Sequence, residues 1–321
     1  ARLTKLEIYK LEQELEELKK LIARLTAIVE SKKLQMEVVK DELKELKKQY
    51  KSERRSALVL DASDIKVEKF DDARPVEKCV LLYTAADTVK VVAEKNFNMS
   101  DKTLGERATL AAVFKLQLKT STDKIVYSFT NFGNCYKIDF EDVVVGKLKD
   151  SGTAYKELCP DALEGEKPIA FYEVGEKLPK GSLLFYSRLG YVKKSDWKEY
   201  NILKYAFQAC KVNEGDELIG METDDPDPTV TLFFVTEQGM CLNAYKNDIP
   251  TQGRVSAGVR GIKLAEGDKV VFAGQIDGEG EIIVATDGNT YKKVIASQVD
   301  PMARYRQGVK IVDLGKGRKV M

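Results

Sequence analysis

A pair of short apolar strands around a tight turn recurs along the chain, and this repeat restricts the fold more than any other feature. Copies occupy residues 79–90, 125–137, 183–194, 231–242 and 282–293. Their turns hold Asp87, Gly133, Gly190, Gly239 and Gly288. Glycine or aspartate suits a tight hairpin turn that needs a positive φ angle. The repeat therefore predicts a series of β-hairpins.

A second strand-turn-strand element follows in the later copies, at residues 209–219, 258–271 and 308–321. Its turns contain Gly215, Gly267 and Gly317. Together the two elements give about four strands in roughly 50 residues, which is typical of one propeller blade. We therefore expect a mainly β, propeller-like domain over residues 58–321, with about five to six four-stranded blades of which the first two are degenerate.

The first 57 residues have a different, helical pattern. Apolar residues separated by steps of four and three form the seam of a coiled coil: Leu11, Leu15, Leu18, Ile22, Leu25 and Val29. The pattern stops near Ser31, a plausible N-cap, and resumes in a second helix that ends near Lys51. Such a narrow apolar stripe needs a partner helix. We expect a helical coiled-coil segment over residues 1–57, and a generic oligomerisation stalk fits the spacing equally well.

Composition excludes several classes of site. The chain has no histidine, so catalytic triads with histidine and His-ligated metal sites are ruled out. Its five cysteines are scattered and never form a Cys-x-x-Cys pair, so we expect reduced structural thiols and no metal site. No apolar run is long enough to cross a bilayer. We expect a cytoplasmic protein without a membrane partner.

The repeats resemble a known family. Residues 252–271, QGRVSAGVRGIKLAEGDKVV, are similar to the blade motif in the C-terminal domains of the A subunits of DNA gyrase and topoisomerase IV. Residues 183–196 resemble the same motif. Residues 2–7 resemble the point where those subunits leave their C-gate region, and residues 42–55 resemble the end of the helix just before the C-terminal domain. The resemblance covers nearly the whole chain and is weakest over residues 58–180.

The resemblance implies a β-pinwheel whose basic rim bends duplex DNA and has no catalytic residue. In the parent type II topoisomerase, a homodimer of A subunits works with two B subunits, in an A2B2 enzyme near the nucleoid. The resemblance places the cleavage tyrosine before residue 1 and ATP with Mg²⁺ elsewhere, so this part itself needs no cofactor. Tyr305, within Ala303-Arg304-Tyr305, only weakly resembles the Arg-Tyr motif around that nucleophile.

One departure separates the two enzymes of the family. The A subunits of gyrase have a Gln-Arg-Arg-Gly-Gly-Lys-Gly type of box after the first hairpin. The matching stretch here, residues 96–110 (NFNMSDKTLGERATL), has no such box. This favours a topoisomerase IV-like protein that relaxes and decatenates DNA, with a gyrase wrapping domain as the alternative.

Bending DNA requires Lys and Arg aimed at phosphates. The candidate DNA contacts recur at equivalent places of the blades: Arg254, Arg260, Lys263, Arg304, Arg306, Lys310, Lys193, Lys194, Lys292 and Lys293. We expect Trp197, Tyr200 and Tyr205 to pack in the core or between blades, and residues 224–228 (DDPDP) to form an inter-blade loop rather than a cation site.

Charge supports a rival hypothesis. Residues 1–57 hold 15 Lys or Arg against 11 Asp or Glu, whereas residues 58–321 hold 37 against 40. A domain that binds DNA through its overall field would be more basic. A propeller scaffold on a coiled coil, which binds proteins and not DNA, is therefore the alternative from another class.

Overall fold

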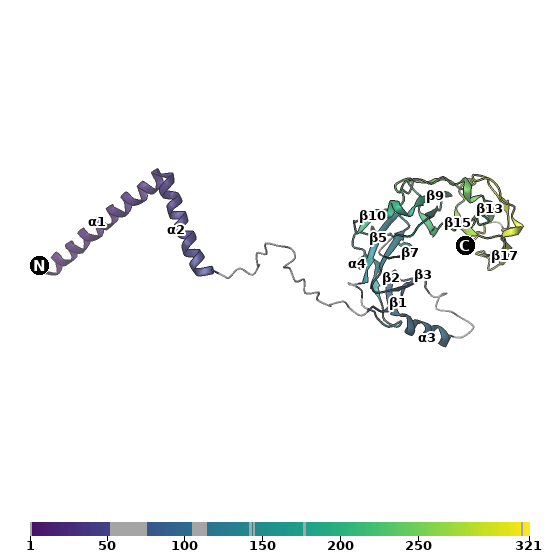
Figure 1. Cartoon of the computed structure of the whole chain (residues 1–321), viewed down its shortest axis with the longest axis horizontal. Helices are drawn as coiled ribbons and strands as arrows, with labels where there is room; N and C mark the ends of the chain where they lie inside the picture. Colours follow the sequence, from purple (N-terminus) through teal and green to yellow (C-terminus); the bar gives the residue numbers. More distant parts are fainter. Residues whose placement is uncertain are drawn as a thin grey trace, which may run out of the picture. The chain divides into compact units, whose positions relative to one another are not determined.

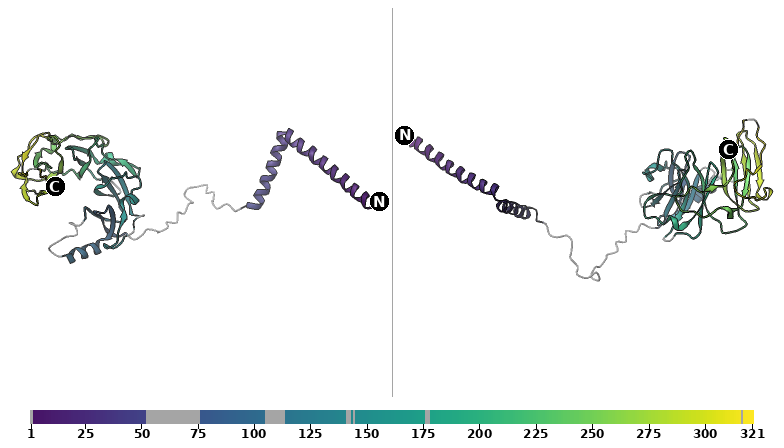
Figure 2. Two further views of the ribbon diagram at one scale, coloured as in Figure 1. Left: turned by 180° about the vertical axis from the view of Figure 1, so that it is seen from behind. Right: turned by 90° about the horizontal axis from the view of Figure 1, so that it is seen from above.

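The structure is a computed structural model that describes residues 2–51, 76–104, 114–140, 143, 145–175, 178–315 and 317–321. The chain divides into two units, Ala1–Asp71 and Asp72–Met321, which are described separately. Figure 1 labels the helices and strands of both, and Figure 2 gives two further views. The domain boundary predicted at residue 57 lies outside the described residues.

The first unit contains two helices, α1 (Arg2–Glu30) and α2 (Lys32–Tyr50), which confirms the helical prediction. They are separated by Ser31, whose extended backbone (φ −117°) makes it the N-cap of α2, although its side chain makes no capping hydrogen bond. The predicted seam is solvent-accessible, since Leu11, Leu15 and Leu18 are 63%, 53% and 50% exposed. The seam is therefore free to pack against a partner helix, as its spacing predicts.

The second unit is built from antiparallel sheets. The first sheet orders its strands β3 (Leu116–Ser121), β1 (Lys78–Tyr83), β2 (Thr88–Ala93), β6 (Thr153–Ala154). The second has β7 (Pro168–Val174), β4 (Ile125–Thr130), β5 (Asn134–Asp139), β10 (Ala206–Gln208). The third has β11 (Leu218–Thr223), β8 (Ser182–Ser187), β9 (Tyr191–Asp196), β14 (Val259–Arg260). The fourth has β15 (Val270–Ile276), β12 (Thr231–Thr236), β13 (Met240–Ala244), β18 (Val309–Lys310).

The prediction of four-stranded blades is thus confirmed for these four sheets, and the first two are complete although the sequence predicted them to be degenerate. The last sheet differs. Within the described residues it contains two strands, β16 (Glu281–Ala285) and β17 (Tyr291–Ile295). Val320 forms an antiparallel bridge with Thr286 beside this hairpin. Short helices complete the unit: α4 (Tyr155–Leu158), η4 (Trp197–Tyr200), η5 (Lys246–Asp248) and η6 (Ala296–Gln298).

Each four-stranded sheet takes its last strand from a later part of the chain than its hairpin. The strand β10 follows β9 in sequence but pairs with β5 of the preceding sheet, where Phe207 faces Cys135. In the same way Val259 of β14 faces Val192, and Val309 of β18 faces Cys241. The chain therefore crosses back over the previous sheet at every step, which joins neighbouring sheets covalently and by hydrogen bonds.

The core lies between successive sheets, because alternate residues of each strand point to opposite faces. In β8, Phe185 packs towards the second sheet with its ring 5.7 Å from that of Phe129. The neighbouring Tyr186 packs towards the fourth sheet, 6.2 Å from Phe234. Trp197 and Tyr200 are fully buried in the former cluster, which confirms their predicted core position.

The order of strands in each sheet defines a hub and a rim. The strands β3, β7, β11 and β15 contact one another in succession, so they lie towards the hub. At the opposite edge of each sheet are β6, β10, β14 and β18, which therefore form the rim. Figure 1 shows the sheets following one another in chain order along a curve.

The turn chemistry is confirmed at most of the predicted positions. Positive φ angles occur at Asp87 (57°), Gly133 (81°), Gly190 (79°) and Gly239 (76°). The last hairpin differs, because the left-handed residue is Asn289 (φ 54°) and not the predicted Gly288. Asparagine tolerates this conformation through local hydrogen bonding, so the glycine beside it is not needed there.

A helix not predicted from the sequence covers the outer face of the first sheet. Phe97 of α3 (Glu94–Leu104) is buried against Val80, Leu82 and Val92. The first hairpin is therefore packed on both faces, by α3 on one and by the second sheet on the other.

Candidate nucleic-acid interface

Six of the ten predicted DNA contacts lie in the rim strands or in the segments beside them: Arg254, Arg260, Lys263, Arg304, Arg306 and Lys310. Residues 201–205 precede β10, residues 249–258 precede β14, and residues 299–308 precede β18. The strand register makes Phe207, Val259 and Val309 equivalent, because each faces the residue two places after a left-handed glycine. Equivalent residues of the three loops are found by counting back from these strands.

Two of the predicted contacts, Arg254 and Arg304, link one rim loop to the preceding rim strand. The Nη1 of Arg304 donates to the carbonyl of Arg260 at 3.2 Å. Arg254 donates in the same way to the carbonyl of Gln208, the residue equivalent to Arg260. Because both side chains are held by backbone carbonyls, their recurrence has an architectural cause.

Arg260 is held on the surface between two tyrosines. Its guanidinium lies 5.5 Å from the ring centre of Tyr305 and 5.8 Å from that of Tyr191. It donates to the hydroxyl of Tyr305 at 3.0 Å and to that of Tyr191 at 3.4 Å. The hydrogen bonds to Tyr191 and Tyr305 raise the pKa of the Arg260 side chain above its ordinary value. The side chain is exposed and charged, and its position is fixed in advance of any ligand.

The same contacts explain Tyr305. This residue has a left-handed backbone (φ 60°), which is uncommon for a bulky side chain. Its amide donates to the carbonyl of Gly261 at 2.5 Å. The conformation directs the ring onto Arg260, so Tyr305 positions a cation.

Arg260, Lys263, Arg304 and Arg306 form what we call the rim cluster. Two segments, residues 260–263 and 304–306, supply these side chains. They lie side by side, since the amide of Lys263 donates to the carbonyl of Arg306 at 3.0 Å. Lys263 and Arg306 are exposed, and neither forms an ion pair with any described carboxylate. Cations without a carboxylate partner can bind phosphate at no cost of breaking a pair. The cluster is therefore a candidate phosphate-binding surface.

Other predicted contacts have partners within the chain. Lys310 pairs with Asp313 at 2.8 Å, and Lys293 pairs with Glu281 at 2.5 Å. Both pairs are exposed and hence weak, so these lysines could exchange partners. Lys194 is held more firmly within the chain. Its ammonium group pairs at 2.6 Å with Asp224, and Asp224 also lies 3.4 Å from Lys246. Residues 224–228 connect β11 to β12, which confirms the predicted inter-blade loop.

Lys193 is placed differently from the expected surface position, because its side chain is buried at 1% exposure. Its Nζ donates to the carbonyl of Ala209 at 2.8 Å and to that of Arg254, and it lies 5.2 Å from the ring centre of Phe185. Burial lowers the pKa of Lys193 to about 8; Cys210 and Glu199 oppose this shift, and Arg254 adds to it. An ammonium group enclosed in this way cannot reach DNA in this conformation.

The position of Lys193 is itself a repeated architectural feature. Lys90 and Lys292 likewise lie three residues after the left-handed turn residue. Lys90 donates to the carbonyl of Leu148 at 3.1 Å, and Lys292 donates to that of Ile311 at 2.5 Å. In each case the lysine donates a hydrogen bond to a backbone carbonyl in a segment that contains a rim strand. Lys292 remains exposed and keeps a place among the candidate contacts, whereas Lys193 does not.

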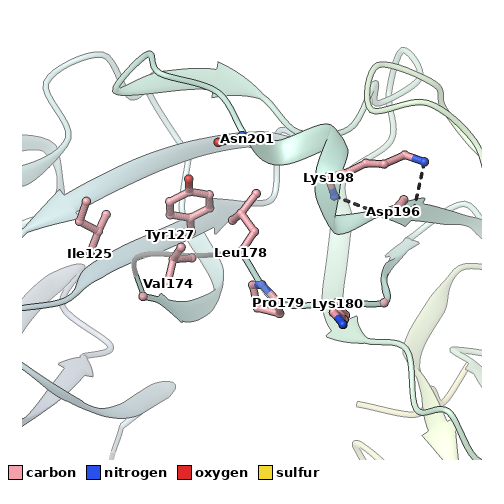
Figure 3. Close-up of a pocket in the computed structure, with 11 residues that line it drawn as sticks. Ile125, Tyr127, Val174, Leu178, Pro179, Lys180, Asp196, Lys198 and Asn201 are labelled. Carbon is pink, nitrogen blue, oxygen red and sulfur yellow. Dashed lines mark hydrogen bonds and ion pairs between the residues drawn. The ribbon is translucent and has the colours of Figure 1, made fainter.

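A cavity of about 630 Å³ opens between the second and third sheets (Figure 3). Ile125, Tyr127 and Val174 line one side, and Asp196 with Lys198 lies on the other. The two charged residues form a 3.4 Å ion pair. The remaining charged residue of the lining is Lys180, and the lining offers no activated nucleophile.

The cysteines show no sign of a reactive thiol or of a metal site. All five cysteines are free and buried, and burial raises the pKa of Cys79 and Cys210 to about 11. Within the described residues, no three metal-ligating side chains converge on one point. Helices long and apolar enough for a bilayer are likewise absent from the part of the chain that the structure describes.

Comparison with known proteins agrees with this architecture. Residues 181–223, 231–277 and 280–320 match the family model "DNA gyrase C-terminal domain, beta-propeller". These ranges correspond to the third, fourth and fifth hairpins with their following strands. The repeat and the rim thus define the class: a C-terminal β-pinwheel of the kind found in the A subunits of bacterial type II topoisomerases.

Similar proteins identify the branch of that class. The A subunit of DNA topoisomerase 4 from Staphylococcus epidermidis is 26% identical over 313 residues, and the one from Staphylococcus aureus is 28% identical over 316 residues. Each match covers 97% of this chain but only 38% of the relative. Similar folds occur in a crystal structure of the C-terminal domain of DNA topoisomerase IV (TM-score 0.65, 24% identity, 76% of both chains) and in the Escherichia coli ParC C-terminal domain (TM-score 0.55, 15% identity, 76% of this chain and 99% of that one).

The chain is therefore similar to the C-terminal β-pinwheel domains of the A subunits of topoisomerase IV, and it has two helices before the pinwheel. The predicted preference for the topoisomerase IV branch is confirmed. The chain spans about 38% of the length of the curated relatives, so their similarity does not assign the activity of a whole enzyme to this chain.

Proposed function

We propose that this chain is the DNA-binding and DNA-bending module of the A subunit in an ATP-dependent type II topoisomerase that relaxes and decatenates DNA. In this proposal it works within an A2B2 enzyme, beside the nucleoid in the cytoplasm, as a non-catalytic part. DNA cleavage, ATP and Mg²⁺ belong to other parts of that enzyme. The similarity to A subunits of topoisomerase IV supports the place of the chain in such an enzyme, and the exposed cations of the rim support DNA binding.

The observation that carries the proposal is the rim cluster. Arg260, Lys263 and Arg306 are exposed cations without a described ion-pair partner, although the unit that bears them is nearly neutral overall. A local stripe of this kind can bind phosphates without a strongly basic domain. Its cations come from loops and strands that recur at the same place on successive sheets, which suits a curved DNA backbone rather than reading of single bases.

The experiment is a fluorescence anisotropy titration of the full chain on a labelled duplex of about 40 base pairs, repeated between about 50 and 200 mM salt. The proposal predicts binding that weakens steeply with salt, by roughly 0.9 logarithmic units per logarithmic unit of salt for each phosphate contacted. Absence of binding at the lowest salt would refute it.

The protein scaffold remains the second candidate, because residues 58–321 hold 37 Lys or Arg against 40 Asp or Glu. It predicts no salt-dependent DNA binding. A gyrase wrapping domain would bind DNA equally well but would in addition wrap it with a fixed sign of writhe. A topology assay distinguishes this wrapping domain from the proposed bending module. In it, circular DNA is nicked and ligated with the chain bound, and only wrapping leaves supercoils in the product.

A further inference from the structure

Three rim loops present an apolar residue at the same position. Counting back four places from the equivalent rim residues Phe207, Val259 and Val309 gives Leu203, Val255 and Tyr305. Their side chains are 98%, 54% and 42% exposed. Single exposed apolar residues need no explanation. However, exposed apolar residues that recur at one register position on three consecutive loops do need an explanation.

Neighbouring loops are tied together, so these residues form a row along the rim. Arg254 joins its loop to the carbonyl of Gln208, and Arg304 joins the next loop to that of Arg260. Each arginine directly precedes one of the apolar residues. Cations thus flank every apolar position: Lys204, Arg254, Arg304 and Arg306 are the sequence neighbours. We call Leu203, Val255 and Tyr305 the apolar tips.

The combination of a cation and an apolar tip suits one part of duplex DNA. Phosphates line the minor groove, which is about 6 Å wide and admits single side chains but not a helix. Its walls are deoxyribose, whose carbon atoms offer an apolar contact. Proteins that bend DNA through the minor groove often combine arginine with an apolar side chain placed against or between the base steps.

We propose that the apolar tips enter the minor groove wherever it faces the rim, while the flanking cations bind the two phosphate backbones. This inference rests on the proposed function, because it names how the same rim bends its DNA. Leu203, almost wholly exposed, makes the deepest contact. Tyr305 makes a shallower one, since its ring also rests on Arg260. The equivalent place in the first rim loop, four residues before Thr153, holds the exposed Lys149, so that loop contributes a phosphate contact instead.

The test measures bending and affinity together on a duplex of about 40 base pairs with a donor and an acceptor dye at its ends. The full chain is compared with the double variant Leu203→Ser and Val255→Ser. A matched control replaces Leu163 and Ile283 by serine; these are also exposed (59% and 75%) but lie outside the rim loops. Substituting residues this exposed does not threaten the fold, and thermal unfolding checks it.

The proposal predicts that the double variant loses at least half of the change in energy transfer and binds about tenfold more weakly, with the salt slope unchanged. The control double variant bends DNA like the parent chain. Leu203→Met, which keeps an apolar tip, retains bending. Bending and affinity equal to the parent in the serine variant would overturn the inference while leaving the proposed function intact. A loss of affinity accompanied by a lower salt slope would also overturn it, because the tips would then act only through neighbouring cations. A parent chain that fails to bind DNA at low salt would instead refute the proposed function itself.

Discussion

The buried Lys193 makes the stability of the pinwheel depend on pH in a way that a single substitution can isolate. Its pKa is about 8 in the folded chain, against an ordinary value of 10.5. Below pH 8 the amine is charged in both the folded and the unfolded chain. Between pH 8 and 10.5 the unfolded chain holds a proton that the folded chain has released. Stability must therefore rise with pH across this window.

The magnitude follows from the size of this window. One pKa unit corresponds to about 1.4 kcal/mol, so raising the pH from 7 to 9.5 adds roughly 2 kcal/mol to the free energy of unfolding through Lys193 alone. Lys193→Met removes the titrating group but keeps an unbranched chain against Phe185 and Tyr200, the two rings that Lys193 contacts. The difference between parent and variant then cancels every other group that titrates in both.

The assay is urea unfolding of both chains at several pH values between 7 and 9.5. The chain has a single tryptophan, Trp197, which is fully buried one residue beyond β9 and reports on the region around Lys193. We predict that the parent gains about 2 kcal/mol over the variant from the lowest to the highest pH. This account of Lys193 would be refuted if the free energies of unfolding of the two chains changed in parallel with pH. It would also be refuted if the parent became less stable relative to the variant as the pH rises.

Two further predictions concern how successive sheets are joined. Gly258→Ala should destabilise the chain by roughly 2 kcal/mol in urea unfolding, because φ is +85° there and a Cβ would lie 2.4 Å from the carbonyl oxygen of Val192; Gly253→Ala, with open space around its Cβ, is the control, and equal stability of the two variants would contradict the close approach. Arg304→Ala should cost about 1 kcal/mol by removing the 3.2 Å hydrogen bonds to the carbonyls of Asp248 and Arg260, whereas Arg306→Ala, without such bonds among the described contacts, should stay within about 0.5 kcal/mol of the parent in thermal unfolding. A larger loss in the Arg306 variant would count against the linking role of Arg304.

Local sequence patterns were sufficient for the hairpins and for their turns. Alternating apolar residues around Gly133, Gly190 and Gly239 specify both a strand pair and a left-handed turn, so the repeat is visible without a structure. The crossing strands were beyond such reasoning. Phe207 and Cys135 pair across more than 70 residues of chain, and a local pattern contains no information about such a partner. The helix α3 was also missed, because its main anchor to the sheet is the single residue Phe97.

The position of the candidate site could be predicted only in part, for a related reason. Basic residues at equivalent places in the repeats did indicate the rim, and Arg260, Lys263 and Arg306 lie there. Recurrence alone could not separate phosphate contacts from structural links, because a repeated fold repeats both. Lys193 and Lys194 are adjacent on β9 and point to opposite faces, and only the packing shows that Lys193 faces the core. Tyr191 and Tyr305, which hold Arg260, belong to the site although no spacing linked them.

The rim cluster is the centre of this account, and matched charge removal tests it most directly. One variant carries Arg260→Ala, Lys263→Ala and Arg306→Ala. The other carries Lys198→Ala, Lys293→Ala and Lys319→Ala, three exposed lysines that already pair with Asp196, Glu281 and Glu237. Both variants lose the same net charge, so any effect of the overall field is equal.

The measurement is the dependence of duplex DNA affinity on salt for the parent and the two variants. We predict that the rim variant binds more weakly and that its slope falls by roughly 2.7, about 0.9 for each lost phosphate contact, while the control variant keeps nearly the parent slope. Equal slopes in the two variants would contradict the claim that these three cations form the DNA-binding surface.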